Sequence, residues 1–275
     1  MKRKSLWFFL KYTLLFLSAV LVIFPLFFVG LSSFKNNEEI FSGAFSLPSR
    51  IHFENYIKPF NDVFHLHTYF INSFLYSIFV CVLSVLVNSM AAYAIGRLKW
   101  KASKIVMGLF LSGLMIPLHA LIVPLYISVS RFNMPSQLAL MLLFTASSIP
   151  ISVFLIVGFL SSIPRAIEES AVIDGCSIPR MFFTIVIPLI KPALATVTIF
   201  NFMGVWNDLM LSLIFLNEEK FKTLQLGIMR FKGSFYSDYG LILSAIVLSI
   251  IPSVAVYLAM SDKLISGLTS GAVKG

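Results

Sequence analysis

Long runs of apolar residues alternate with short charged segments along this chain of 275 residues. Several runs reach the ~20 residues that a helix needs to cross the hydrocarbon core of a bilayer. Read in order, the runs predict six membrane-spanning helices, at residues 12–31, 69–95, 105–130, 137–163, 192–216 and 241–260. The pattern therefore predicts an all-α polytopic membrane protein that forms one transmembrane domain over residues 1–275.

The first apolar run follows the basic sequence MKRKS, so a cleaved signal peptide is the alternative to a first membrane helix. The run from Tyr12 to Leu31 is longer than an ordinary signal-peptide apolar region, and no A-x-A-like cleavage site follows it. A retained first helix is favoured.

Residues 164–191 join the fourth and fifth runs but are unsuited to the hydrocarbon. Glu168, Glu169 and Asp174 lie close together in a chain that is only 12% charged. A carboxylate at the bilayer centre costs about 2.5 to 3.5 kcal/mol even on a lenient scale. The segment is also much longer than the roughly 2–8 residues that usually join two helices. We therefore expect a structured segment at one membrane face.

Turn residues within this segment predict a helix–glycine–helix elbow. A short helix is expected to end at Asp174-Gly175, where glycine can adopt the left-handed conformation, and a second helix to begin near Ser177 and Pro179. An apolar patch on the first arm is expected to face outward and to fit a groove of another protein; it consists of Ala166, Ile167, Ala171 and Ile173. The alternative is an amphipathic hairpin on the lipid surface, which the acidic residues disfavour beside an anionic leaflet.

Composition and charge agree with a membrane protein and set its orientation. The chain is 58% hydrophobic, its mean hydropathy is +0.92 and its formal net charge is +9. With the N-terminus inside, the predicted inner segments hold most of the 21 Lys and Arg residues, four of them in the loop at 97–104. This is the positive-inside pattern, so both termini and the elbow are expected to be cytoplasmic. Membrane topology explains the excess of basic over acidic residues, so nucleic acid is not expected as a partner.

The sequence contains no recognisable catalytic, cofactor or metal motif. A G-x-x-x-x-G-K-[ST] phosphate loop, an H-E-x-x-H motif and a Gly-x-Ser-x-Gly elbow are all absent. Cys81 and Cys176 show no metal-ligand spacing and are expected to be packing residues. The three histidines of the predicted outward loop 32–68 are interpreted as solvated side chains. The second outward loop, 217–240, either meets a partner or is simply exposed to solvent.

Polar residues in the fifth predicted helix are candidates for a translocation pathway. Asn201 and Asp208 are seven positions apart, which places them on nearly one face of a continuous helix. Trp206, Asn207 and Asp208 combine the aromatic and hydrogen-bonding groups that suit a sugar. Bonding between helices is an equally good interpretation of Asn201 and Asp208. It is the favoured one for Asn72 and Asn88, and His119 beside Pro117 is interpreted as a kink residue.

The sequence EESAVIDGCSIPRMFFTIVIPL resembles the EAA loop of bacterial ABC importer permeases, in which E-A-A, a glycine and I-x-L-P recur at fixed spacing. Ser170 and Ile187 depart from that pattern by small changes. The segments INSFLYS, MAAYAIGRLKWKASK, MIPLHALIVPLY, VWNDLM and GLTSGAVKG are similar, in order, to the maltose-permease-like carbohydrate branch. The resemblance covers nearly the whole chain from about residue 12.

This resemblance implies a non-enzymatic subunit of an ATP-driven sugar importer in the bacterial cell membrane. Its implied partners are a second permease, two ATP-binding subunits and an extracytoplasmic sugar-binding protein. The implied ATPase-coupling residues are Glu168, Glu169, Ala171, Asp174 and Gly175. The cytoplasmic tail 261–275 is implied to reach the ATPase through Gly267, Leu268, Gly271 and Lys274. The alternatives are a permease for a non-sugar solute and a stand-alone secondary transporter, although no second acidic elbow marks an internal repeat. An intramembrane enzyme is disfavoured by the lack of a catalytic constellation.

Overall fold

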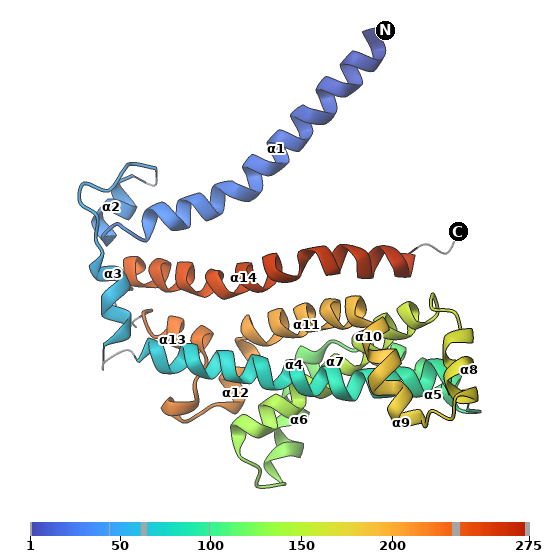
Figure 1. The fold of residues 1–275 in the computed structure, drawn as a ribbon. Coiled ribbons are helices and arrows are strands. Elements are labelled where there is room, and N and C mark those ends of the chain that lie inside the picture. Colours follow the sequence, from blue (N-terminus) through green and yellow to red (C-terminus); the bar gives the residue numbers. More distant parts are fainter. Residues whose placement is uncertain (1, 44, 62–64, 99, 233–236, 273–275) are drawn as a thin grey trace. The chain divides into compact units, whose positions relative to one another are not determined.

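In a computed structural model, every regular element of the described residues is helical (Figure 1). These residues are 2–43, 45–61, 65–98, 100–232 and 237–272, with side chains described between residues 7 and 261. One isolated antiparallel bridge pairs Lys232 with Ser237. The all-α class predicted from the apolar runs agrees with this architecture.

The backbone divides into two compact units. The first comprises residues 1–67 and 227–252, and the second comprises residues 68–226 and 253–275. The first unit contains α1 (Lys2–Ser32), α2 (Asn37–Ser42), α3 (Glu54–Ile57), η1 (Lys58–Phe60) and the beginning of α14 (Tyr239–Ala272). The second unit contains most of α4 (Leu66–Arg97) and all the helices between α4 and α13 (Leu224–Met229).

Among the described residues, four helices are long and apolar enough to cross a membrane. They are Trp7–Ser32 within α1, α4, α7 (Ser136–Leu160) and Tyr239–Ser261 within α14. Two bent helix pairs raise the number to six if each pair is one span. Four predicted spans therefore occur as long helices, and the total of six depends on how the bent pairs lie in a bilayer.

The span predicted at 105–130 is not one continuous helix. The structure has α5 (Ser103–Gly113), the 3-10 turn η2 (Leu118–Leu121) and α6 (Ile122–Ser130), with a bend of 87° between the two halves. Pro117 is extended, with ψ of 121°, and it has no N–H with which to continue a helical hydrogen-bond pattern. The predicted kink at this position is therefore a complete break, and His119 lies in η2.

The span predicted at 192–216 is interrupted as well. Helix α11 (Lys191–Trp206) ends at Trp206, and α12 (Met210–Phe215) begins four residues later. Before α11, the segment Ile178–Leu189 meets it at 78°. At the other end of the chain, α14 continues to Ala272, so the described part of the predicted tail is helical.

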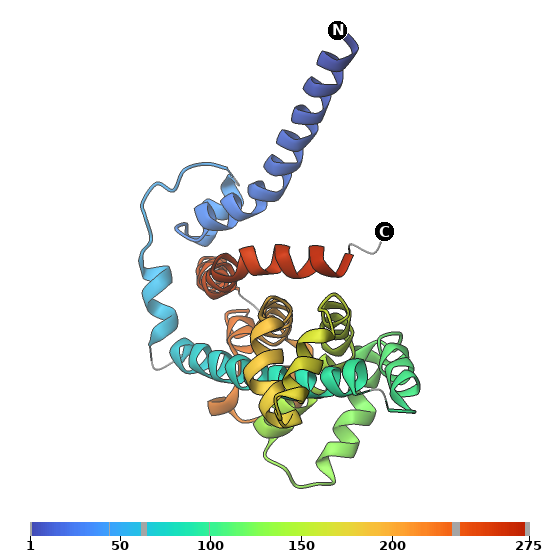
Figure 2. The same cartoon turned by 45° about the vertical axis from the view of Figure 1, so that its right-hand side comes forward.

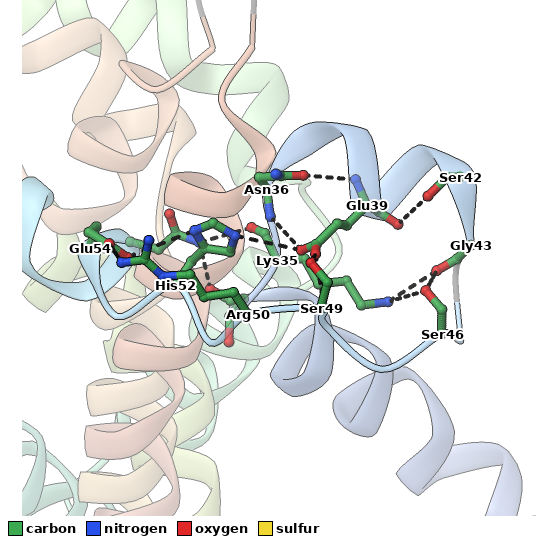
Figure 3. Close-up of polar contacts among 12 residues, drawn as sticks. Lys35, Asn36, Glu39, Ser42, Gly43, Ser46, Ser49, Arg50, His52 and Glu54 are labelled. Atoms are coloured by element: carbon green, nitrogen blue, oxygen red, sulfur yellow. Dashed lines mark hydrogen bonds and ion pairs between the residues drawn. The ribbon is translucent and has the colours of Figure 1, made fainter.

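A hydrogen-bonded loop follows α1 in the first unit (Figure 3). Asn36 and Glu39 form a capping box at the start of α2, and the Glu39 carboxylate also accepts hydrogen bonds from the backbone N–H and hydroxyl of Ser49. The buried Lys35 donates from Nζ to the Gly43 carbonyl at 3.0 Å. These bonds fix residues 35–49 through side chains, since few regular backbone bonds are available there.

Asn55 ties this loop to α14 within the first unit. Its Nδ2 donates to the carbonyls of Ser33 and Lys35, each at 2.9 Å, and its own carbonyl accepts from the Ser244 hydroxyl at 2.6 Å. A Cβ on Gly240 would lie 2.8 Å from the Lys35 carbonyl oxygen, so glycine is needed for this close approach.

Polar side chains of α4 join this helix to other parts of the second unit by hydrogen bonds. Ser84 and Asn88 both bond the Ser148 hydroxyl of α7 at 3.0 Å, as expected for polar residues that join membrane helices. Nearer its start, Asn72 Nδ2 donates to the carbonyls of Lys220 and Lys222, each at 2.9 Å. The structural interpretation of Asn72 and Asn88 agrees with these bonds, although Asn72 holds a loop and not another helix.

Candidate functional site

The first arm of the 164–191 connector is α8 (Ala166–Ile173), which ends in a Schellman motif. Gly175 has φ of +78°, its N–H bonds the Val172 carbonyl at 3.0 Å, and the Cys176 N–H bonds the Ala171 carbonyl at 2.9 Å. These bonds satisfy two of the carbonyls that a helix end leaves without a partner. Glycine carries the reversal because the left-handed region is costly for other residues.

The second arm begins at Ser177, whose backbone is extended, and Pro179 lies in the first turn of α9 (Ile178–Met181). A π-helical turn, η3 (Phe182–Val186), and α10 (Ile187–Leu189) then lead to α11. Met181 and Phe182 are buried in a core shared with α4, α7 and α11. The second arm is therefore anchored in this core; Figure 2 gives a second view of its ribbon, in yellow, near α4, in teal.

Arg97, the last residue of α4, joins three elements at this connector. Its Nε lies 3.0 Å from an oxygen of Glu168 in the first turn of α8, and the two side chains are 5% and 14% exposed. Its Nη2 donates to the Leu160 carbonyl at 2.6 Å and to the Ile163 carbonyl at 2.8 Å. In the sequence, Arg97 counted only toward the positive-inside pattern. The sequence signal for its contact with Glu168 is a basic residue at the end of an apolar run, in a chain with a few clustered acids.

The two adjacent glutamates of α8 have different surroundings. Glu168 is directed inward to Arg97, and the Tyr93 hydroxyl of α4 also donates to it at 3.5 Å. Glu169 and Asp174 are exposed. Glu169 and Asp174 are thus accessible to another protein, whereas Glu168 is engaged within the chain.

The apolar surface of the connector agrees in part with the predicted patch, because Ala166, Ile167 and Ile173 are exposed as expected. Ala171 is buried and packs in the core, so it cannot belong to an outward-facing patch. The exposed apolar side chains nearest the turn are Val172, Ile173 and Ile178, and Ile173 is 85% exposed. We call these three residues the elbow ridge. The error arose because a short helix without a strong apolar periodicity does not reveal which face packs inward.

A pocket of about 510 Å³ lies beside the elbow ridge, between the end of α4 and the two arms. Its lining includes Tyr93, Arg97, Glu169, Val172 and Ile178. The pocket thus combines an apolar wall with charged groups at its edge, a composition that suits an inserted side chain of a protein partner.

The polar residues predicted for a pathway are not on one helix face. Asn201 lies inside α11 and is 6% exposed, and its Nδ2 has no hydrogen-bond partner among the described residues. Trp206 is fully buried, with Phe202 stacked on it and Phe70 edge-on. Asp208 lies beyond the end of α11. The expected two-turn alignment of Asn201 with Asp208 is therefore wrong, because the helix between them ends.

Asp208 instead initiates α12. Its carboxylate accepts hydrogen bonds from the backbone N–H groups of Leu211, at 3.4 Å, and Ser212, at 2.9 Å. Aspartate favours this role because its short side chain reaches N–H groups that a new helix leaves without partners. Asn207 is exposed and bonds the Met203 carbonyl from Nδ2 at 3.0 Å. The more accessible members of the predicted set are thus Asn207 and Asp208.

The remaining predicted positions lie near the C-terminus. Gly267, Leu268 and Gly271 belong to α14, and Lys274 lies outside the described residues. Within the described part of the chain, no group of three or more His, Cys, Asp or Glu residues could hold a metal ion. In the loop after α1, His52 lies between Glu39 and Glu54, at 3.8 Å from each carboxylate.

Residues 84–268, more than half of the chain, match the family described as binding-protein-dependent transport system inner membrane component. The chain is 33% identical over 272 residues to the probable ABC transporter permease protein YurM of Bacillus subtilis strain 168, covering 98% of this chain and 88% of the relative. It is 34% identical over 251 residues to the melibiose/raffinose/stachyose import permease protein MelC of the same strain, covering 90% and 91%.

Two further proteins are similar over nearly the full length. The diacetylchitobiose uptake system permease protein NgcG of Streptomyces coelicolor is 32% identical over 265 residues, which are 95% of this chain and 87% of the relative. A crystal structure of a bacterial ABC transporter involved in the import of the acidic polysaccharide alginate matches with a TM-score of 0.84 and 21% identity, over 96% of this chain and 98% of that one. At that identity, the likeness shows the fold alone.

Proposed function

The chain belongs to the family of binding-protein-dependent transport system inner membrane components, and from this premise we propose that it is the permease subunit of an ATP-driven sugar importer. The substrate class is supported by relatives such as MelC and NgcG, whose names specify oligosaccharides. Members of this family are transport components, so the chain is a multi-pass membrane protein and not an enzyme. A permease for a non-sugar solute is the alternative.

We further propose that the connector 164–191 couples the permease to ATP-binding subunits. The observation that carries this role is the exposed elbow ridge beside the accessible Glu169, held in place by the buried anchors Met181 and Phe182. Exposed apolar side chains at a rigid turn favour docking to a protein. In this proposal Glu169 and Asp174 provide charges at the contact, and Gly175 forms the turn. Glu168 and Ala171 hold the first arm against the rest of the chain, through Arg97 and the core.

The proposed assembly contains this chain, a second related permease, two ATP-binding subunits and an extracytoplasmic sugar-binding protein. The C-terminal residues Gly267, Leu268, Gly271 and Lys274 are proposed to contact the ATP-binding subunits. Among the pathway candidates, Asn207 and Asp208 are proposed to line the route, because Asn207 is exposed and Asp208 is partly exposed. Asn201 and Trp206 would then support that wall from behind.

Orientation is proposed from charge, with both termini and the elbow in the cytoplasm. Single cysteines introduced at Ser5, Ser177 and Ser270 in a background without native cysteines would test it with a membrane-impermeant thiol reagent. All three should react only after the membrane is opened. Reaction at any of them in intact cells would contradict the proposed orientation.

The whole proposal is tested by purifying the tagged chain from its native membrane and identifying the proteins that accompany it. An importer subunit should bring an ATP-binding subunit and a second permease, and the reconstituted assembly should take up labelled oligosaccharide when ATP and the binding protein are supplied. Uptake of a different solute under the same conditions would support the alternative permease. Transport by the isolated chain, driven by an ion gradient, would identify a secondary transporter.

A further inference from the structure

The buried guanidinium of Arg97 has more partners than a topology signal requires. It contacts Glu168 of α8 through Nε at 3.0 Å and the carbonyls of Leu160 and Ile163 through Nη2 at 2.6 and 2.8 Å. The nearby basic residues Lys101 and Lys104 are exposed. An exposed basic residue would satisfy the positive-inside rule equally well. The rule therefore does not explain why Arg97 is buried.

The geometry explains why arginine, in particular, occupies this position. Leu160 is the last residue of α7, and its carbonyl is among those that a helix end leaves without a partner inside the helix. A planar guanidinium can direct several N–H donors at fixed angles, and a cation is favoured at a helix C-terminus. Glu168, in the first turn of α8, is favoured at a helix N-terminus by the same dipole effect. One side chain thus joins the ends of α4 and α7 to the beginning of α8.

We propose that Arg97 is a positioning residue that fixes the angle of the elbow relative to α4 and α7, so that displacement of α8 moves these two helices with it. This inference rests on the proposed coupling function of the connector. It assigns the adjacent acids different tasks, because Glu169 faces a partner while Glu168 connects the elbow to the rest of the permease. The Arg165 guanidinium, which donates to the Gly96 carbonyl at 3.4 Å, provides a second, exposed link between the same elements.

The test compares Arg97→Gln and Arg97→Lys with Lys104→Gln, which removes a nearby exposed charge that has no part in the connection. Each variant is purified with its native ATP-binding subunits and second permease, and is reconstituted with the sugar-binding protein in vesicles. Three quantities are measured: the amount of ATP-binding subunit recovered, the ATP hydrolysis rate and the sugar transported per ATP hydrolysed. Lys104→Gln should match the unmodified protein in all three.

Arg97→Gln should assemble but lose about fivefold or more in sugar transported per ATP, the range typical of coupling between two sites. Arg97→Lys keeps the charge but not the planar fork of N–H donors. Its amount of sugar transported per ATP should therefore lie between the values for Arg97→Gln and the unmodified protein. If assembled Arg97→Gln complex transports the normal amount of sugar per ATP, and only its yield is reduced, Arg97 is merely structural and the inference is wrong.

A distance measurement provides a readout that does not depend on transport. Spin labels at the exposed positions Ile173 and Lys101, in a background with both native cysteines replaced by serine, report the position of the elbow relative to the segment after α4. Arg97→Gln and Glu168→Gln should broaden the distance distribution, whereas Lys104→Gln should leave it narrow. Unchanged distributions in the first two variants would overturn the positioning role.

Failure of the inference can be distinguished from failure of the proposed function. If Glu169→Lys and Gly175→Val leave ATPase recovery and uptake intact, the connector does not couple the permease to an ATPase, whatever Arg97 does. If those variants are defective while Arg97→Gln behaves like Lys104→Gln in every measurement, coupling stands and the positioning role is lost.

Discussion

The backbone N–H of Cys176 lies 2.9 Å from the carbonyl oxygen of Ala171, and this bond closes the turn between the two arms of the elbow. Ala171 is buried, and Cys176 packs against the same core. The turn is therefore fixed by a hydrogen bond and by apolar packing on one side, while the elbow ridge remains exposed on the other. A rigid turn that presents exposed apolar side chains is suited to transmit movement between proteins.

Replacing Gly175 should disrupt this turn through backbone strain alone. No atom lies within 4 Å of a Cβ built there, but φ is +78°. Gly175→Val should cost on the order of 1–3 kcal/mol and reduce both uptake and recovery of the ATP-binding subunit. Gly175→Asn should be milder, because asparagine tolerates the left-handed region.

Gly108→Ala is the matched control for the Gly175 variants. Gly108 lies in α5 with open space around a Cβ and no positive φ, so this change should leave uptake and recovery of the ATP-binding subunit unchanged. Equal uptake by Gly175→Val and the control would show that the turn is dispensable.

Reversing the charge of Glu169 should weaken binding of the ATP-binding subunit by about tenfold or more, since a misplaced charge at an interface costs several kcal/mol and ~1.4 kcal/mol is already tenfold. Affinity is measured with the purified ATP-binding subunit and permease complex in nanodiscs. Glu38→Lys makes the same charge change at an exposed position in the other unit and should have no effect. Normal affinity of Glu169→Lys would exclude this residue from the contact.

Asp208 can be tested so that its two candidate roles give different results. Asp208→Ala removes the acceptor for the Leu211 and Ser212 N–H groups and should cost about 0.5–2 kcal/mol at the start of α12. Asp208→Asn keeps an acceptor oxygen but removes the charge. A role in the pathway predicts that both variants lose uptake while complex recovery stays normal. If Asp208→Asn has normal uptake, the residue acts through the helix start alone.

The loop after α1 should lose stability in acid because of Glu39. Hydrogen bonds from the side chain and then the backbone of Ser49 are the main causes that lower the pKa of Glu39 below its usual 4.5. Because the folded-state pKa is depressed, its stabilising contribution is complete above the unfolded pKa and is lost as pH falls through the lower, folded value. Hydrogen exchange of residues 36–49 should therefore accelerate below about pH 4.5.

Glu39→Gln should remove most of this dependence on pH, while Glu38→Gln, on the exposed side of the same helix, should retain it. The measurement is hydrogen exchange followed by mass spectrometry, at a series of pH values corrected for the intrinsic exchange rate. An identical profile in the Glu39 variant and the unmodified protein would show that another group controls the loop.

The membrane class, four of the long helices and the position of the glycine turn can be predicted from the sequence alone. These features depend on local chemistry, because an apolar run of sufficient length partitions into lipid and an acidic segment does not. The left-handed turn also followed from local chemistry, since glycine is the residue that reaches φ of +78° without strain. The EAA-like spacing then carried the family assignment, which the match over residues 84–268 confirms.

Contacts between distant segments determine which neighbour each side chain meets. Adjacent glutamates in α8 look equivalent in sequence, but Arg97, far away along the chain, engages Glu168 and leaves Glu169 exposed. The packing of α8 on the core decided that Ala171 is inside. The apolar run continues past Trp206, so hydropathy does not reveal the helix break there. After the break, the Asp208 carboxylate accepts hydrogen bonds from the N–H groups of Leu211 and Ser212. Periodicity and hydropathy describe one segment at a time, whereas these outcomes depend on contacts between segments.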